Sequence, residues 1–219
     1  LRTRMLKLGK YAKAFIVHDD ELLPHFSQEL KPYIVPLRIE PERFTPEYPD
    51  PAKGKVTIVH APSNRGVKGT KYIHSAVENL KKKYDIEYIL VENMTQNEAF
   101  KEYQKADIIV DQILGGSYGV LSIEAMAMGK PVITYITDEM IKTFPDELPI
   151  VSASPLNIQE EIEKLINDGQ IRHDLGVKGR KYIETYHDCK KNAKVIAKIY
   201  EGTANKTKGK DAFEEVKEL

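Results

Sequence analysis

The stretch KVTIVHAPSNRGVKGTKYIHSAVENLKKKYDIEYILVENMTQNEAFKEYQKADIIV, residues 55–110, decides the fold class. Short apolar runs alternate in it with longer segments whose apolar residues recur every three or four positions. This pattern predicts strand, helix, strand, helix and strand. Strands joined by helices pair in parallel, and right-handed crossovers place those helices on both faces of the sheet. The sequence therefore predicts an α/β fold built on a mostly parallel sheet.

The same alternation extends in both directions from this stretch. Thr95 and Glu98 predict a capping box at the start of one helix, and Gly129 predicts the end of another. The expected strands are 14–18, 33–37, 55–60, 86–91, 107–111, 131–136 and 149–152. The expected helices are 20–30, 68–84, 95–105 and 119–128, then one opened by Ser154 and Pro155, and mainly helical structure over 156–200 with a break near His187.

Prolines mark the main boundary along the chain. Pro41, Pro46, Pro49 and Pro51 fall in a short span, which indicates a linker over residues 41–54. We expect a separate part over residues 1–40, the regular α/β domain over 55–200 and a loose polar tail over 201–219.

The overall composition excludes several classes of protein. The 219 residues carry 33 Lys+Arg and 33 Asp+Glu, so the net charge is zero, which argues against a dedicated nucleic-acid-binding protein. No apolar run approaches the about 20 residues that span a bilayer. The single cysteine, Cys189, fits a reducing compartment, and no secretory signal is visible. We expect a cytoplasmic protein, and either a fragment or a processed product because the chain opens at Leu1 rather than at Met.

The first stretch of the chain is basic. It carries five cations and no acidic residue over residues 1–13. Such a run either contacts a membrane surface or nucleic acid, or forms the solvated face of a helix. A peripheral contact with the inner face of the membrane is one of our expectations.

Two loops at the expected carboxyl edge of the sheet carry chemistry, and the first is HAPSNRGVKG, residues 60–69. Gly66 and Gly69 relax the backbone, while Arg65 and Lys68 place two cations beside a helix N-terminus. These features suit an anion, above all a diphosphate. A basic surface loop without a ligand explains the same spacing equally well. The loop matches neither a P-loop nor a G-x-G-x-x-G turn.

The second loop opens the run GGSYGVLSIEAMAMGKPVI, residues 115–133. Its glycines allow close approach of a ligand after a buried strand, and the helix that starts at Gly119 points free N–H groups at the same space. Glu124 lies in an otherwise apolar part of that helix and must find partners. Either a neighbouring Lys or Arg neutralises it, or it accepts hydrogen bonds from the two vicinal hydroxyls of a ribose.

Three blocks of sequence together resemble one family. The run SYGVLSIEAMAMGKPVI resembles the signature E-G-F-G-L-x-x-x-E-A-M-A-x-G-x-P-V-I of retaining GT-B glycosyltransferases of group 1, family 4. Lys68-Gly69 matches their K-G motif, and VPLRIEPERFTP, residues 35–46, resembles their linker V-P-N-G-V-D-x-x-x-F-x-P. The resemblance covers about residues 14–200.

The resemblance implies an architecture and an activity. The family has two Rossmann-like domains with the active site in the cleft between them, and its C-terminal domain binds the nucleotide-sugar donor. Residues 55–200 would be this Rossmann-like donor-binding domain, and residues 1–40 a remnant of the N-terminal acceptor domain. The implied reaction transfers a sugar from a nucleoside-diphosphate sugar, with UDP or GDP as the nucleotide, to an acceptor hydroxyl with retention. It serves polysaccharide or glycoconjugate synthesis and requires neither a metal nor another cofactor.

The resemblance also implies roles for individual residues. Lys68 would contact the diphosphate, Arg65 would be its partner and Glu124 would bind the donor ribose, so we expect these three to be the catalytic residues. We expect the donor-binding residues to be Ser63, Asn93, Met94, Gly116, Ser117, Tyr118, Gly119, Val120 and Glu124.

The sequence departs from the family pattern in two places. Arg65 stands three residues before Lys68, whereas the family has five, and Ser63 occupies the usual position. Gly116 stands eight residues before Glu124, where the family has a first glutamate that touches the transferred sugar. This second departure bears on sugar recognition and on activity.

Three interpretations of function follow. In the first, the chain is the donor part of a transferase whose acceptor, a glycan or a lipid-linked molecule, is held by a missing domain or partner subunit. The chain by itself then binds donor without turnover. In the second, it is a non-catalytic nucleotide-sugar-binding module or one subunit of a split transferase. The third, a nucleotide-sugar epimerase, fits the E-A-M-A-x-G-x-P-V-I block less well.

Weaker candidates lie outside these motifs. Asp19-Asp20 suggests either a metal-binding pair or the N-cap of a helix, and the cap is favoured. His60 either touches a ligand or is a packed, satisfied histidine. Cys189 has no companion pattern for a nucleophile, and Tyr182 and Tyr186 are expected to be packing residues.

Overall fold

The computed structural model describes residues 2–27 and 30–219, and contacts divide the chain into two compact units. We call Glu42–Ile136 with Glu147–Ile183 the sheet unit. We call Leu1–Pro41, Thr137–Asp146 and Glu184–Leu219 the terminal unit. Each unit is therefore built from segments that are not continuous in sequence.

The sheet unit contains a five-stranded sheet in which every neighbouring pair is parallel. Its strands are β3 (Val56–His60), β4 (Ile86–Leu90), β5 (Ile108–Val110), β6 (Val132–Thr134) and β7 (Ile150–Ser152). Their order across the sheet is β4-β3-β5-β6-β7. The predicted parallel α/β sheet is confirmed, and all five predicted strands of this region form.

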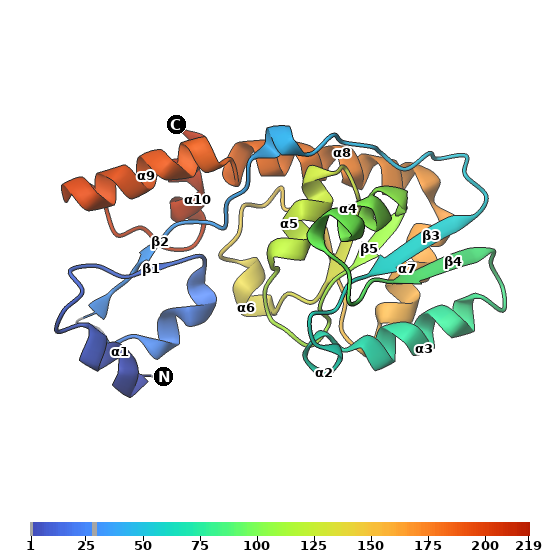
Figure 1. Cartoon of the computed structure of the whole chain (residues 1–219), viewed down its shortest axis with the longest axis horizontal. Helices are drawn as coiled ribbons and strands as arrows, with labels where there is room; N and C mark the ends of the chain where they lie inside the picture. The colour runs from blue at the N-terminus through green and yellow to red at the C-terminus, as the bar shows by residue number, and fades with distance from the viewer. Residues whose placement is uncertain (1, 28–29) are drawn as a thin grey trace. The chain divides into compact units, whose positions relative to one another are not determined.

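Helices cover both faces of this sheet, as Figure 1 shows with α3 and α7 on one side and α4 and α5 on the other. The helices are α2 (Arg65–Lys68), α3 (Thr70–Leu80), α4 (Gln96–Lys105), α5 (Val120–Ala127), α7 (Ile158–Asn167) and α8 (Gly169–Tyr186), which continues into the terminal unit. One apolar core joins α3 and α7 to the sheet through residues such as Ile58, Ile73 and Ile162, each 0% exposed. The sheet unit is thus a Rossmann-like three-layer α/β structure.

Local sequence signals set several helix ends. Thr95 and Glu98 form the predicted capping box at the start of α4. Gly129, with φ of 75°, follows the end of α5 as predicted. The predicted helix over 68–84 is interrupted instead, because Gly69 adopts φ of 77° between α2 and α3. Asn64 caps α2 by accepting hydrogen bonds from the N–H groups of Gly66 and Val67.

The strand order creates a switch point beside β3. The chain runs from β3 outward to β4, then crosses to the opposite side of β3 to form β5. The loops that follow β3 and β5 therefore diverge over opposite faces, and ligands of open parallel sheets bind in the crevice that such loops leave at the carboxyl ends. Both sequence-predicted loops, residues 60–69 and 111–119, start at this place.

The proline-rich segment belongs to the sheet unit from Glu42 onward. The Arg180 guanidinium on α8 donates hydrogen bonds to the carbonyls of Phe44 (2.7 Å) and Ala127 (2.8 Å), and the Glu47 N–H donates to the Met128 carbonyl. This segment is packed onto the end of α5. Whether residues 1–40, 41–54, 55–200 and 201–219 act as the expected domains stays a prediction.

The terminal unit combines short elements from both ends of the chain. They are α1 (Arg2–Leu8), β1 (Ile16–Val17), a 3₁₀ helix (Asp20–His25), β2 (Tyr33–Ile34), α6 (Asp138–Ile141), α9 (Cys189–Glu201) and α10 (Lys210–Lys217). β1 and β2 pair in parallel, and the predicted break near His187 lies between α8 and α9.

Two predictions for this unit were wrong. The helix expected over 20–30 is a short 3₁₀ helix, because Pro24 lies inside it and has no N–H to donate; residues 28 and 29 lie outside the described residues. The tail expected to be loose contains α10, whose Phe213 is 1% exposed and makes edge-to-face contacts with Phe144 and Tyr186. Among the described residues, no helix is long and apolar enough to cross a membrane.

Candidate functional site

Lys68 lies at the switch point with its ammonium group already hydrogen-bonded. At the end of α2, its Nζ donates to Asp111 Oδ1 at 2.7 Å and to Gln112 Oε1 at 3.1 Å. The Asp111 side chain is 0% exposed and that of Lys68 is 15% exposed. Asp111 Oδ2 accepts a second hydrogen bond, 2.8 Å long, from Ser122 Oγ of α5. The ion pair therefore connects the loop after β3 with the loop after β5 and with the first turn of α5.

Arg65, the second predicted cation, is held differently. Its guanidinium forms a two-pronged ion pair with the Glu92 carboxylate after β4, with Nε 2.7 Å from Oε1 and Nη2 close to Oε2. This pair raises the pKa of Arg65 and lowers the pKa of Glu92. Because the Arg65 side chain is 64% exposed, water screens the pair and it adds little to stability.

The loop after β5 leads into α5, which starts at the same carboxyl edge of the sheet. Gln112 Nε2 donates to the Ser117 carbonyl at 2.6 Å and so braces the loop from within. Gly119 is the N-cap of α5 and no side chain caps the helix. The first N–H groups of α5 therefore have no intrahelical acceptor and are oriented toward the carboxyl edge.

The remaining residues predicted on this loop differ in burial. Ser117 and Tyr118 are buried, whereas Val120 is exposed and Gly116 is half-buried. The Tyr118 hydroxyl lies 3.4 Å from the Tyr182 hydroxyl of α8. The side chain of Tyr118 is therefore packed into the sheet unit.

Glu124 is half-buried on α5, and burial raises the pKa of its carboxyl group. Among the described residues its hydrogen-bond partner is Gln96, whose Nε2 lies 3.4 Å from Oε1. The alternative that a neighbouring Lys or Arg neutralises it is not found among those residues. A half-buried carboxylate with one long hydrogen bond retains acceptor capacity for a ligand.

The other predicted residues lie on the surrounding loops. Ser63 is exposed between β3 and α2, and Asn93 and Met94 are exposed between β4 and α4. Asn93 has φ of 56°, the left-handed region that Asn tolerates better than most residues. The predicted site residues thus lie on the segments that follow β3, β4 and β5, with Arg65 and Lys68 on α2 and with Val120 and Glu124 on α5.

His60 is a satisfied core histidine rather than an exposed ligand group. Its ring is buried, with Nδ1 2.8 Å from the Val110 carbonyl and Nε2 2.9 Å from Thr70 Oγ1. This pairing means that Nδ1 carries the proton and Nε2 accepts from the threonine hydroxyl. Burial lowers the pKa of His60, so the ring stays neutral and ties β3 to β5 and to the start of α3.

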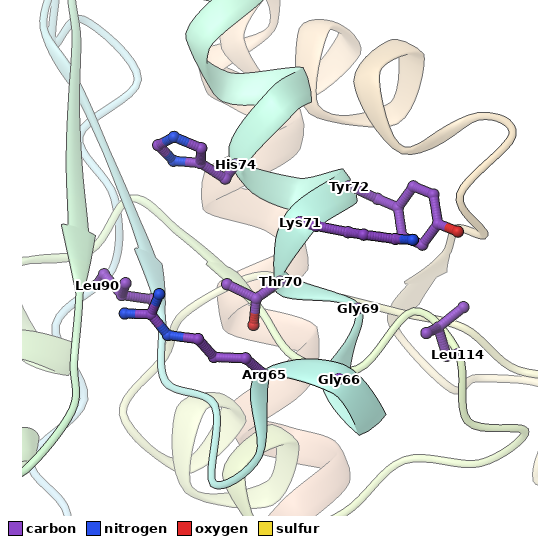
Figure 2. A pocket seen from close by; sticks show the side chains of 9 residues that line it. All are labelled: Arg65, Gly66, Gly69, Thr70, Lys71, Tyr72, His74, Leu90 and Leu114. Carbon is purple, nitrogen blue, oxygen red and sulfur yellow. The ribbon is translucent and has the colours of Figure 1, made fainter.

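A cavity of about 590 Å³ lies around the turn between α2 and α3. Figure 2 shows Arg65 and Leu90 on one side of the first turn of α3, with Tyr72 and Leu114 on the other. Of the predicted site residues, Arg65 alone lines this cavity. It therefore adjoins the switch point without containing Lys68, Glu124 or the start of α5.

Sequence reasoning missed four side chains of this region: Glu92, Gln96, Asp111 and Gln112. Asp111 ends a predicted buried strand at the ligand edge, and that position was the available signal. Its pairing with Lys68, 43 residues earlier, depends on which strands are neighbours.

In the terminal unit, Asp19 accepts a hydrogen bond from the Glu21 N–H as the N-cap of the 3₁₀ helix. His18, Asp19 and Glu21 place possible metal-ligand atoms within 4.8 Å of one another.

Comparison with solved structures identifies the fold. Neither a protein-family model nor a curated protein matches the chain. Sucrose-phosphate synthase from Thermosynechococcus elongatus matches with a TM-score of 0.68 and 16% identity, over 92% of this chain and 61% of that one. The C-terminal domain of a glycosyl transferase group 1 family protein from Francisella tularensis matches with a TM-score of 0.53 and 19% identity, over 69% of this chain and 99% of that one.

A third match comes from Anabaena. HepE in complex with UDP and glucose matches with a TM-score of 0.70 and 11% identity, over 91% of this chain and 66% of that one. At these identities the likeness concerns the fold, and this chain spans less than two thirds of the sucrose-phosphate synthase. The chain therefore has a Rossmann-like α/β fold that it shares with glycosyltransferases of the GT-B type.

Proposed function

We propose that this chain is the donor-binding part of a retaining glycosyltransferase of group 1, family 4, and that it binds a nucleoside-diphosphate sugar. The observation that supports the proposal is the ion pair at the switch point of the parallel sheet, in which Lys68 bonds Asp111 and Asp111 bonds Ser122 in the first turn of α5. No side chain among the described residues caps α5, and the half-buried Glu124 lies further along the same helix. A cation and a helix N-terminus suit a phosphate, and a carboxylate one turn further along suits a ribose.

The chemistry assigned to these groups is binding and charge stabilisation. Lys68, Arg65 and the N–H groups of α5 would stabilise negative charge on the departing nucleoside diphosphate. Each charge-assisted hydrogen bond contributes about 1.5–3 kcal/mol. Arg65 can leave Glu92 for a phosphate at small cost, because that ion pair is exposed to water. The proposed reaction needs neither a metal nor another cofactor.

The other expected residues complete the donor site in this proposal. Glu124 accepts hydrogen bonds from the ribose hydroxyls, and Asn93 and Met94 lie beside the base. Ser63 lies beside the diphosphate, together with the backbone of the loop after β5 and the start of α5. The residues of that backbone are Gly116, Ser117, Tyr118, Gly119 and Val120. UDP and GDP are the proposed nucleotides, and UDP is the nucleotide in the HepE structure.

The acceptor side is proposed to lie outside this chain. Residues 1–40 would be the remnant of an acceptor domain, with residues 41–54 as linker. The acceptor, a glycan or lipid-linked molecule, would be held by further chain or by a partner subunit. The chain alone then binds donor without turnover. We propose a cytoplasmic location for polysaccharide or glycoconjugate synthesis, with the basic residues of 1–13 at the inner face of the membrane.

Calorimetry tests the donor-site proposal. UDP, GDP and ADP are titrated separately into the chain, and at least one is expected to bind at or below millimolar concentration. The matching nucleoside is the control, because it lacks the phosphates that Lys68 is proposed to contact. A folded chain that binds none of the three nucleotides at millimolar concentration contradicts the proposal.

A second candidate is a nucleotide-sugar-binding module without catalysis. Gly116 favours it, because this position lacks the carboxylate that touches the transferred sugar in the resembling family. Joining the chain to its natural upstream sequence and measuring sugar transfer separates the two candidates. Transfer supports the enzyme, and donor binding without transfer supports the module.

A further inference from the structure

The ion pair between Lys68 and Asp111 is held by several further hydrogen bonds. Asp111 is fully buried, and both of its oxygens accept hydrogen bonds, one from Lys68 and one from Ser122. Gln112 adds a second acceptor to the same ammonium group. Lys68 is therefore fixed by two successive residues at the end of β5.

Lys68 has one N–H donor left for a ligand. An ammonium group has three N–H donors, and Asp111 and Gln112 take two of them. The third has no acceptor among the described residues, and the side chain is 15% exposed. Lys68 thus has one N–H left for a ligand, on an ammonium group that Asp111 and Gln112 hold in position.

Lys68 is not free to swing onto a ligand. Moving its ammonium away would leave the buried Asp111 carboxylate without a counter-charge, which is strongly unfavourable. A phosphate must therefore approach Lys68 where it stands, between the start of α5 and the end of α2. Arg65 contrasts with it, because its pair with Glu92 is exposed and can open.

We propose that Asp111 is a positioning residue, which fixes Lys68 so that its third N–H is directed at a phosphate of the bound nucleotide. This inference rests on the proposed donor site and names a residue that serves it. Asp111 itself does not touch the ligand. Its negative charge opposes the binding of an anion, so positioning and simple electrostatics predict opposite effects when Asp111 is removed.

The test replaces Asp111 rather than Lys68, because Lys68→Ala would leave the buried Asp111 carboxylate without a counter-charge. Asp111→Ala removes both acceptors and the negative charge. Asp111→Asn removes the charge but keeps an oxygen for Lys68 and an amide that can donate to Ser122. The quantity measured is the phosphate increment, the ratio of the dissociation constants for a nucleoside and for its diphosphate, with whichever of UDP, GDP or ADP binds wild type.

Positioning predicts a loss in one variant and rescue in the other. Asp111→Ala is expected to reduce the phosphate increment about tenfold or more, the effect of one charge-assisted hydrogen bond. Asp111→Asn is expected to stay within about threefold of wild type, because the amide still orients Lys68. Nucleoside binding stays the same in both variants.

The chain offers a matched control at the other end of the same strand. Asp107 precedes β5, is 3% exposed and pairs with Lys53 at 2.5 Å, while also accepting a hydrogen bond from the Thr57 N–H. Asp107→Ala therefore removes a buried carboxylate with a lysine partner far from the carboxyl edge. It is expected to lower stability while leaving the phosphate increment unchanged.

The outcomes separate the two proposals. If no nucleotide binds wild type, the donor site and the role of Asp111 both fall. If a nucleotide binds and Asp111→Ala binds it as well as wild type or more tightly, the donor site stands and the positioning role is overturned. An equal loss in Asp107→Ala overturns it too, because the effect then follows from stability. Loss in Asp111→Ala with rescue in Asp111→Asn supports it.

Discussion

Glu124 is a residue at which stability and function are expected to oppose each other. Burial raises the pKa of its carboxyl group, so the charged form is destabilised in the fold, and Gln96 at 3.4 Å compensates weakly. Glu124→Gln is expected to leave the fold intact or slightly more stable, because a neutral amide is easier to bury. It should weaken nucleotide binding by about 1–3 kcal/mol through the lost ribose acceptor. Calorimetry and urea unfolding measure the two effects.

The 2′,3′-dideoxy nucleotide is the control ligand for Glu124. It lacks the hydroxyl groups from which the carboxylate is proposed to accept hydrogen bonds, so wild type and variant should bind it about equally. A variant that still prefers the ribose nucleotide as strongly as wild type would show that Glu124 is not the ribose ligand.

At the scale of elements, the turn between α2 and α3 decides where Lys68 stands. Gly69 has φ of 77°, and a Cβ there would lie 2.6 Å from Ile113 Cγ1. Gly69→Ala is expected to cost about 1–2 kcal/mol for the left-handed backbone, plus a packing cost of about 1–3 kcal/mol because the added Cβ displaces Ile113 in the loop after β5. Urea unfolding followed by circular dichroism measures the sum.

Gly202 provides the comparison that isolates the packing cost. It ends α9 with φ of 73°, and nothing lies within 4 Å of a Cβ built there. Gly202→Ala should therefore show the backbone cost alone. Equal losses of stability in the two variants would mean that the contact with Ile113 relaxes freely.

For the whole molecule, acid is expected to destabilise both units through buried histidines. Burial lowers the pKa of His187 to about 4 in the terminal unit and also lowers the pKa of His60 in the sheet unit. Between pH 6.5 and 4 the unfolded chain binds a proton at His187 that the folded chain does not, so stability falls as pH falls and is fully present above pH 6.5. The loss from His187 between pH 7 and 5 is about 2 kcal/mol.

His187→Gln checks this pH dependence. The glutamine amide can donate to the Leu37 carbonyl, as His187 Nδ1 does, but it does not titrate. The free energy of unfolding of the variant should fall about 2 kcal/mol less than that of wild type between pH 7 and 5. Parallel pH curves for the two proteins would contradict the assignment.

The sequence was a good guide to the elements of the sheet unit. The five strands, the Thr95–Glu98 capping box, the stop at Gly129 and the break near His187 were predicted from local pattern alone, because periodicity and capping are local properties. α10 was missed because its apolar residues, among them Phe213, are few and lie in a polar segment. Its stability comes from packing against distant residues such as Phe144.

What the sequence determined by itself was the parallel α/β class, the two loops at the carboxyl edge and the candidate residues Arg65, Lys68 and Glu124. Tertiary structure alone decided how those residues are held. The order β4-β3-β5 makes neighbours of strands far apart in the chain, and it thereby joins Lys68 to Asp111 and places His60 between Val110 and Thr70. Such pairings follow from strand order, and no local pattern of residues encodes which strands become neighbours.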